Sequence, residues 1–207
     1  ADAARALLAD IAGAWSPARD APWQGRLRAD IGDLGWLADL LGEEWQSAGR
    51  LNGELQLAGT PNRPLHSGRL HGEQLALRLP AQGLNLAHGE LDIDLRDNLL
   101  HINRFAFDSL LQPLPRPLRL EARGDLSGLD KTPGRLDVSG ELRLGGQAGA
   151  ESGWLDVRLD RLGAFQLPDQ WVAVSGNGRL SWQDGTLGTR ARLAVDAGYW
   201  QLAKAGT

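Results

Sequence analysis

From about residue 49 to the end of the chain, leucines alternate with charged or amide side chains, and glycines separate the runs. Examples of this alternation are Gly49-Arg-Leu-Asn-Gly-Glu-Leu-Gln-Leu-Ala-Gly59, Leu75-Ala-Leu-Arg-Leu79, Leu91-Asp-Ile-Asp-Leu95, Leu118-Arg-Leu-Glu-Ala122, Leu136-Asp-Val-Ser-Gly-Glu-Leu-Arg-Leu144, Leu155-Asp-Val-Arg-Leu159 and Ala191-Arg-Leu-Ala-Val195. A period of two predicts strands with one apolar and one hydrated face. Nearly every segment follows it, so the pattern predicts one long antiparallel sheet. Its apolar face must be covered by more sheet or by something that is not protein.

The first 48 residues follow a different pattern. Residues 2–14 read as a short helix, and residues 23–31 as a first strand with Leu27, Ala29 and Ile31 on one face. Asp33 is a candidate N-cap for a second helix over about 34–46. We therefore expect short helices and a first strand in 1–48 that cap the sheet, and one continuous β domain in 49–207.

Turn signals divide the β region into hairpins. Residues 60–64 form a proline-bounded turn, and 112–117 contain alternate prolines that an interior strand does not tolerate. The latter segment is expected to be an edge segment or a linker. The chain has 27 Gly and 10 Pro, and we assign the glycines to turns and bulges.

The alternation defines which side chains face inward. On this basis the candidate apolar lining of a groove is Leu51, Leu55, Leu57, Leu75, Leu77, Leu79, Leu91, Ile93, Leu95, Ile102, Leu136, Val138, Leu142, Leu144, Leu155, Val157, Leu159, Leu193 and Val195. The expected outward, hydrated set is Asp92, Asp94, Arg96, Asp137, Arg143 and Arg158. The inward set looks uniformly aliphatic, since the chain has only 1 Tyr and 3 Phe.

Charge and composition narrow the function classes. The formal net charge is −4 with no basic block, which argues against nucleic-acid binding. The absence of cysteine excludes disulfides, thiol catalysis and thiolate metal sites. No apolar run reaches the roughly 18 residues of a membrane span, and residues 1–14 do not resemble a signal peptide. We interpret the sequence as an internal piece of a longer protein.

Candidate catalytic groups lack the partners that chemistry requires. His66, His71, His88 and His101 show no metal-ligand spacing, and Asp92 and Asp94 share the hydrated face. No serine lies in a nucleophile elbow. We therefore expect no catalytic site, no metal and no cofactor, and a protein that is not an enzyme.

Tryptophan is abundant, with 8 residues, 4 of them within the first 45 positions. Tryptophans can stack on sugars or mark a membrane-facing rim. We favour a third interpretation, in which they cap the open end of the apolar sheet. Trp154, Trp182 and Trp200 are expected at strand ends.

A family resemblance adds to this picture. The passage Gly49-Arg-Leu-Asn-Gly-Glu-Leu-Gln-Leu-Ala-Gly-Thr-Pro-Asn-Arg-Pro-Leu-His-Ser-Gly68, continued by Arg69-Leu-His-Gly-Glu-Gln-Leu-Ala-Leu-Arg-Leu-Pro-Ala-Gln-Gly-Leu-Asn-Leu86, resembles the TamB family. The preceding Asp33-Leu-Gly-Trp-Leu-Ala-Asp-Leu-Leu-Gly42 resembles a short helix found before that passage, and residues 134–144 resemble the next repeat. The likeness extends over most of residues 30–200.

The resemblance implies a fold, a cellular location and binding partners. TamB-like proteins belong to the AsmA-like group of bridge-like envelope proteins, whose sheet curls into an open taco with an apolar interior. The family is anchored in the inner membrane of Gram-negative bacteria by an N-terminal helix that this sequence lacks, and it crosses the periplasm. It works with an outer-membrane barrel of the TamA type, in phospholipid transport and outer-membrane assembly. The family has no catalytic residues to transfer.

Three functions stay open at this point. The first is a conduit that shields phospholipid or other acyl chains. The second is a chaperone groove that holds nascent outer-membrane β-strands, because such strands are also apolar on one side. The third is a closed β-sandwich or solenoid that acts as a spacer or adhesin.

Overall fold

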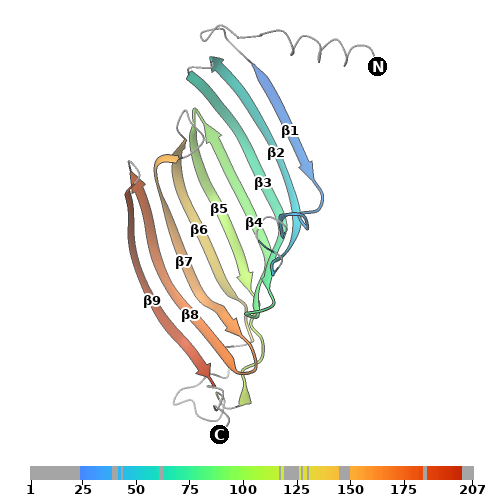
Figure 1. Ribbon diagram of the computed structural model, residues 1–207, viewed down its shortest axis with the longest axis vertical. Helices are drawn as coiled ribbons and strands as arrows, with labels where there is room; N and C mark the ends of the chain where they lie inside the picture. Colours follow the sequence, from blue (N-terminus) through green and yellow to red (C-terminus); the bar gives the residue numbers. More distant parts are fainter. Residues whose placement is uncertain are drawn as a thin grey trace.

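The computed structural model of this chain describes residues 24–38, 42, 44–60, 63–116, 118, 126, 128–129, 131–144, 150–183 and 186–201. The helix expected at 2–14 lies outside these residues. The described residues form one antiparallel sheet (Figure 1). Its strands are β1 (Gly25–Ile31), β2 (Gln46–Thr60), β3 (Arg63–Leu79), β4 (Leu84–Arg96), β5 (Leu99–Ser109), β6 (Gly134–Leu144), β7 (Ala150–Gln166), β8 (Gln170–Gln183) and β9 (Thr186–Trp200).

The strands follow one another in chain order, each paired only with its sequence neighbours, and β1 does not pair with β9. The sheet is therefore an open meander and not a barrel. This confirms the prediction of a mainly β chain built on a long antiparallel sheet. The expected domain boundary at 48/49 falls inside β2, and β1 belongs to the same sheet as the later strands.

In the segment between β1 and β2, residues 35 and 36 form a turn and residues 37 and 38 are helical, whereas residues 39–41 and 43 of the expected helix lie outside the described residues. The Asp33 carboxylate accepts a hydrogen bond from the Gly35 N–H at 2.9 Å, and the Leu37 N–H donates to the Leu34 carbonyl at 2.9 Å. Asp33 therefore caps this turn as predicted. β2 already begins at Gln46, so the strand starts where the helix was expected to end. Leu34 is buried against the apolar face of the sheet.

Leucine lies opposite glycine at many points of the sheet. Gly68 pairs with both Leu55 and Leu95, and Gly176 pairs with both Leu159 and Leu193. A Cβ on Gly176 would lie 2.2 Å from the backbone carbonyl oxygen of Arg192. These glycines lie within strands, which corrects their assignment to turns and bulges. They are needed because neighbouring backbones approach too closely for any side chain.

Bulges interrupt most of the strand pairs. Gln74 in β3, His88 in β4 and Arg161 in β7 have positive φ angles of 54°, 50° and 47°, and the pairing register shifts beside each of them. A bulge inserts an unpaired residue and bends its strand. The long strands of this sheet are accordingly curved rather than straight (Figure 1).

Strands β4 and β7 meet at one end of the sheet, which we call the base. They are separated by β5 and β6 in the strand order, yet the Gln166 N–H at the end of β7 donates to the Gln82 carbonyl before β4 at 2.8 Å. The Gln166 side chain is 2 % exposed, and its Nε2 donates to the carbonyls of Gly83 at 3.0 Å and Leu110 at 3.1 Å. Its Oε1 accepts from the Gln112 N–H. One buried amide thus joins three segments at the base.

The core has two clusters, one on each face of the sheet. On the apolar face, Leu75, Leu86 and Phe107 are buried near the base, and the Phe105 and Phe107 rings pack edge to face with centroids 5.1 Å apart. The expectation of a uniformly aliphatic inward face is therefore wrong at this point. Aromatic rings fill the space where the inward side chains crowd together.

The second cluster lies on the opposite face. Trp171 and Ala173 lie on the same side of β8 as the polar side chains of that strand. They pack with Leu114, Leu118 and Ala197. Leu114 and Leu118 belong to the connection between β5 and β6, and residues 110–115 have no strand structure. The proline-containing segment is therefore a linker, one of the two alternatives expected for it.

We predict that Gly176→Ala lowers the free energy of unfolding by about 1–3 kcal/mol, the usual range for overpacking. The new methyl group would meet the Arg192 carbonyl, which is backbone and cannot rotate away. Gly32→Ala is the control, because no atom lies within 4 Å of its added Cβ. Urea unfolding of both variants tests this, and equal stabilities would show that the strands can separate at Gly176 without cost.

We predict that Gln166→Leu lowers the free energy of unfolding by about 3 kcal/mol or more, because each buried polar group left unpaired costs about 1–3 kcal/mol. The residue keeps a similar size, but Gly83, Leu110 and Gln112 lose their side-chain partner. Hydrogen exchange is expected to accelerate first at the base. Gln56→Leu on the exposed face of β2 is the control, and a similar loss in both variants would contradict the role given to Gln166.

Candidate functional site

The strand register brings the predicted inward residues onto one surface, which we call the apolar face. Leu51 and Leu91 both flank Gly72, Ile93 pairs with Ile102, and Leu159 pairs with Leu136. Following the pairs from strand to strand places the whole candidate set on this face: Leu51, Leu55, Leu57, Leu75, Leu77, Leu79, Leu91, Ile93, Leu95, Ile102, Leu136, Val138, Leu142, Leu144, Leu155, Val157, Leu159, Leu193 and Val195.

The apolar face is covered near the base and open elsewhere. Leu75 and Leu79 are buried, whereas Leu193 and Val195 on β9 are each 67 % exposed and Leu27 on β1 is 59 % exposed. Large exposed apolar surfaces mark interaction sites more often than not. The two ends of the strand order therefore present aliphatic side chains to the surroundings.

Two hollows lie on the apolar face. One, of about 220 Å³, lies over β1 to β5 and is lined by Leu27, Leu55, Leu70, Ile93, Leu95 and Leu100. The other, of about 150 Å³, lies over β7 to β9 and is lined mainly by Val157, Leu159, Leu180 and Leu193. Glycines leave room for both hollows because they have no side chain. Gly53 and Gly68 line the first hollow, and Gly178 lines the second.

The opposite surface carries paired charges, and we call it the charged face. Asp94 accepts hydrogen bonds from Asn103 Nδ2 and Arg69 Nε, both at 2.9 Å. These two bonds, first that of Asn103 and then that of Arg69, lower the pKa of the Asp94 carboxyl. Arg26 and Arg28 of β1 both approach Glu54 of β2.

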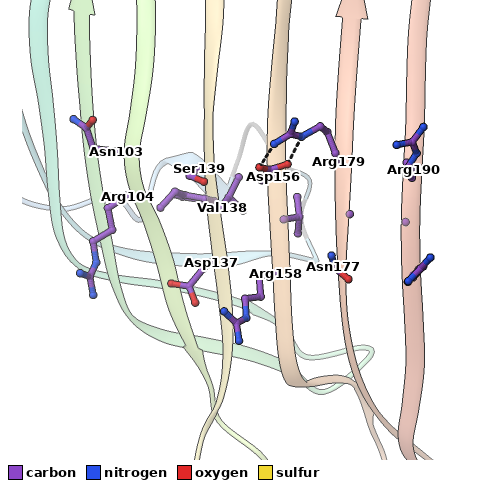
Figure 2. A pocket seen from close by; sticks show the side chains of 15 residues that line it. Asn103, Arg104, Asp137, Val138, Ser139, Asp156, Arg158, Asn177, Arg179 and Arg190 are labelled. Carbon is purple, nitrogen blue, oxygen red and sulfur yellow. Dashed lines mark hydrogen bonds and ion pairs between the residues drawn. The ribbon is translucent and has the colours of Figure 1, made fainter.

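A hollow of about 710 Å³ lies on the charged face over β5 to β9. Figure 2 shows Arg179 of β8 directed at Asp156 of β7, with Arg190 on the neighbouring strand β9. The two hydrogen bonds from the Arg179 guanidinium lower the pKa of Asp156, and this carboxylate raises the pKa of Arg179. Arg158, Asn177 and Arg192 line the same hollow.

The tryptophans do not form one rim. Trp182 and Trp200 lie at strand ends as expected, but Trp154 lies inside β7, where the Arg179 guanidinium stacks 4.8 Å from its ring. Trp171 is buried in the core cluster of the charged face. Trp15 and Trp23 lie outside the described residues.

The histidines lie apart from one another. His66 contacts Asn98, His71 contacts Glu73, His88 contacts Asp108, and His101 contacts Glu141. Among the residues that the structure describes, no group of His, Asp or Glu side chains is arranged to hold a metal ion. Asp92 and Asp94 lie on the charged face, where Asp94 is tied to Asn103 and Arg69.

Sequence reasoning missed several residues of both faces. Leu70, Leu86, Phe105, Phe107 and Leu162 share the apolar face, and bulges that break the simple alternation hid some of them. The arginines of β9 were also missed. The run Thr189-Arg-Ala-Arg-Leu193, whose arginines recur every second residue without a neighbouring acid, was the available signal.

Comparisons of the chain with models of protein families, with curated proteins and with solved structures found no match. Within the described residues, no helix has the length and apolar character to cross a membrane.

We predict that Asn103→Ala and Arg69→Ala each raise the pKa of Asp94 toward its ordinary value of 3.8. The native carboxyl binds its proton less readily than the unfolded one, so its contribution to stability is present above pH 3.8 and disappears as the pH falls through the lowered pKa. Carboxyl-carbon NMR titration measures this directly. Arg50→Ala is the control, and an unchanged pKa in the first two variants would contradict the assignment.

Proposed function

We propose that this chain is a segment of a periplasmic bridge-like protein whose apolar face shields lipid acyl chains between two membranes. One observation carries the proposal: an open sheet presents a continuous aliphatic face that the described part of the chain covers only near its base. The resemblance of residues 49–86 to the TamB family supports the same conclusion and supplies the envelope location. It also suggests an outer-membrane barrel of the TamA type as partner.

The apolar face suits acyl chains in chemistry and in shape. Hollows lined by Leu27, Ile93 and Leu95 on one side, and by Leu159 and Leu193 on the other, offer mainly aliphatic contact. Thr189 is the polar side chain that the register places on this face in the second hollow. Burial of a methylene contributes about 0.8 kcal/mol, so a chain of about 16 carbons gains on the order of 10 kcal/mol before entropic costs. Without specific polar contacts, bound chains are free to slide.

A groove requires the sheet to curl around its apolar face. The bulges at Gln74, His88 and Arg161 bend the strands, and the contact of β4 with β7 draws the base together. We propose that this bending makes an open, taco-like trough that runs across the strands. The charged face then forms its outside, and the base cluster around Phe107 forms one wall.

We predict that Leu27→Asp weakens acyl-chain binding about tenfold or more, equivalent to about 1.4 kcal/mol. A carboxylate in the hollow over β1 to β5 must be desolvated by the bound chain. Leu27 is largely exposed, so the change spares the core. Arg28→Asp places the same charge on the adjacent residue of the opposite face. Fluorescence titration with a pyrene-labelled phosphatidylethanolamine measures both, and equal affinities would refute the proposal.

Photocrosslinking in cells extends the test to the natural cargo. A probe at Ile93, on the apolar face, is expected to capture phospholipid, whereas a probe at Asp92 on the charged face is not. Protein adducts at Ile93 would instead favour the chaperone function. No adduct at either position would favour a closed structural core.

The chaperone function is a second candidate, and one specific observation favours it. The outer edge of β9 is unpaired among the described residues, and Thr186–Asp196 along it is exposed. Exposed sheet edges accept added strands through backbone hydrogen bonds. This candidate uses the sheet edges as well as the apolar face to hold cargo, whereas the first uses the apolar face alone.

A further inference from the structure

One imidazole lies on the apolar face, at the end of the sheet away from the base. His66 of β3 pairs with Leu57 of β2, two residues beyond the pair of Gly68 with Leu55, so it shares the side that carries the aliphatic side chains. Across β2 to β6, the register places no other ionisable side chain of the described residues on this face. His66 therefore gives the aliphatic surface one group that is able to carry charge.

Asn98, in the turn between β4 and β5, fixes the orientation of this ring. Its side-chain oxygen accepts two hydrogen bonds from His66, one from the backbone N–H at 3.0 Å and one from ring Nδ1 at 2.7 Å. An amide oxygen only accepts, so the proton of this bond is on Nδ1. Among the described residues, none forms a hydrogen bond or ion pair with Nε2. The ring is thus held by one nitrogen and offers the other to a ligand.

The surroundings of His66 come from the interior of the sheet. The Asn98 N–H donates to the His66 carbonyl at 3.3 Å, and the Leu144 N–H of β6 donates to the Asn98 carbonyl at 2.8 Å. Each of β2 to β6 has a neighbouring strand on both sides, so this arrangement does not depend on where the sheet ends. His66 is half-buried, and Asp97, the acidic residue of the same turn, is exposed.

The imidazole lies beside the larger hollow of the apolar face. Gly68 lines the hollow of about 220 Å³ over β1 to β5, and His66 precedes it by two residues on the same strand. Two residues of extended strand span about 7 Å. The glycerol unit that joins acyl chains to a phosphate bridges a distance of this order. An acyl chain in the hollow can therefore place the phosphate of its own lipid at His66.

We propose that His66 is the head-group contact of this trough and selects acyl lipids that carry a phosphate. In the protonated ring, Nε2–H donates to a phosphate oxygen while Nδ1–H continues to donate to Asn98. A neighbouring negative charge favours the protonated form of an imidazole, whose charge changes near neutral pH, and such charge-assisted bonds are stronger than neutral ones. This inference rests on the proposed function and specifies its substrate.

The experiment compares two lipids that differ only in the phosphate, pyrene-labelled phosphatidic acid and pyrene-labelled diacylglycerol with the same chains. We expect the native chain to bind phosphatidic acid about tenfold more tightly, a difference of about 1.4 kcal/mol. In His66→Ala the two lipids are expected to bind alike. In His66→Arg, which supplies a permanent cation, the preference for phosphatidic acid is expected to remain.

His71→Ala is the matched control, because His71 belongs to the same strand but contacts Glu73 on the charged face. The preference is expected to be unchanged in this variant. Inorganic phosphate, titrated while the His66 ring signals are followed by NMR, separates a lipid head group from free phosphate as the ligand. We expect no saturable shift, since the acyl chains supply most of the affinity.

Four outcomes would overturn the inference. Equal affinities for the two lipids in the native chain, or a preference that persists in His66→Ala, would remove the selective role of His66. Equal losses for both lipids in His66→Ala and His66→Arg would show a merely structural role, and saturable binding of inorganic phosphate would show a site for the free ion. Binding of neither lipid by the native chain is a different result, because it would overturn the acyl-chain trough itself and this inference with it.

Discussion

The whole structure depends on keeping most of the aliphatic strand side chains on one face across a sheet of 9 strands. A slip of one residue in a single pair would send that strand's leucines to the opposite side. Bulges threaten this order because each adds a residue to one strand only. Here they compensate: β3 gains a residue at Gln74 and β4 gains one at His88, so Leu75 and Leu86 still share the apolar face. The bulges therefore bend the strands, but they do not move the leucines of any strand to the charged face.

The base of the sheet determines how much of that face remains open. Gln166 ties the end of β7 to the start of β4, and Ser109, which is fully buried, accepts a hydrogen bond from the Gly163 N–H at 3.0 Å. With the base drawn together, Phe107 and its neighbours fill the space between the strands. At the other end, the Asn98 backbone in the turn between β4 and β5 donates to the His66 carbonyl of β3 and accepts from the Leu144 N–H of β6. No buried cluster fills the apolar face there among the described residues, and Leu193 stays exposed. The same sheet is therefore a packed core at one end and an uncovered surface at the other.

Much of this fold could be predicted from the sequence because alternation is a local property. The runs around Leu51, Leu91 and Leu155 each specify a strand and its inward side chains without reference to any other segment. The mid-strand glycines and the base could not be predicted in this way. Whether Gly176 sits at a turn or opposite a leucine depends on pairing with β9, and the role of Gln166 depends on segments more than 50 residues away in the chain. For the same reason, the sequence pattern placed Trp154 at a strand end, although it lies inside β7.

An open sheet has two edges, and the two edges of this sheet differ. β1 is short, and its arginines are held by Glu54 of the neighbouring strand. β9 is twice as long, and Asp156, which lies two strands across from Arg190, is already bound to Arg179. The arginines of β1 are thus paired with the neighbouring strand, whereas Arg190 and Arg192 of β9 form no ion pair with a described residue. Opposite charges across neighbouring strands stabilise a sheet and like charges destabilise it, so any strand beside β9, whether from this protein or from a partner, fits best with acidic side chains next to Arg190 and Arg192.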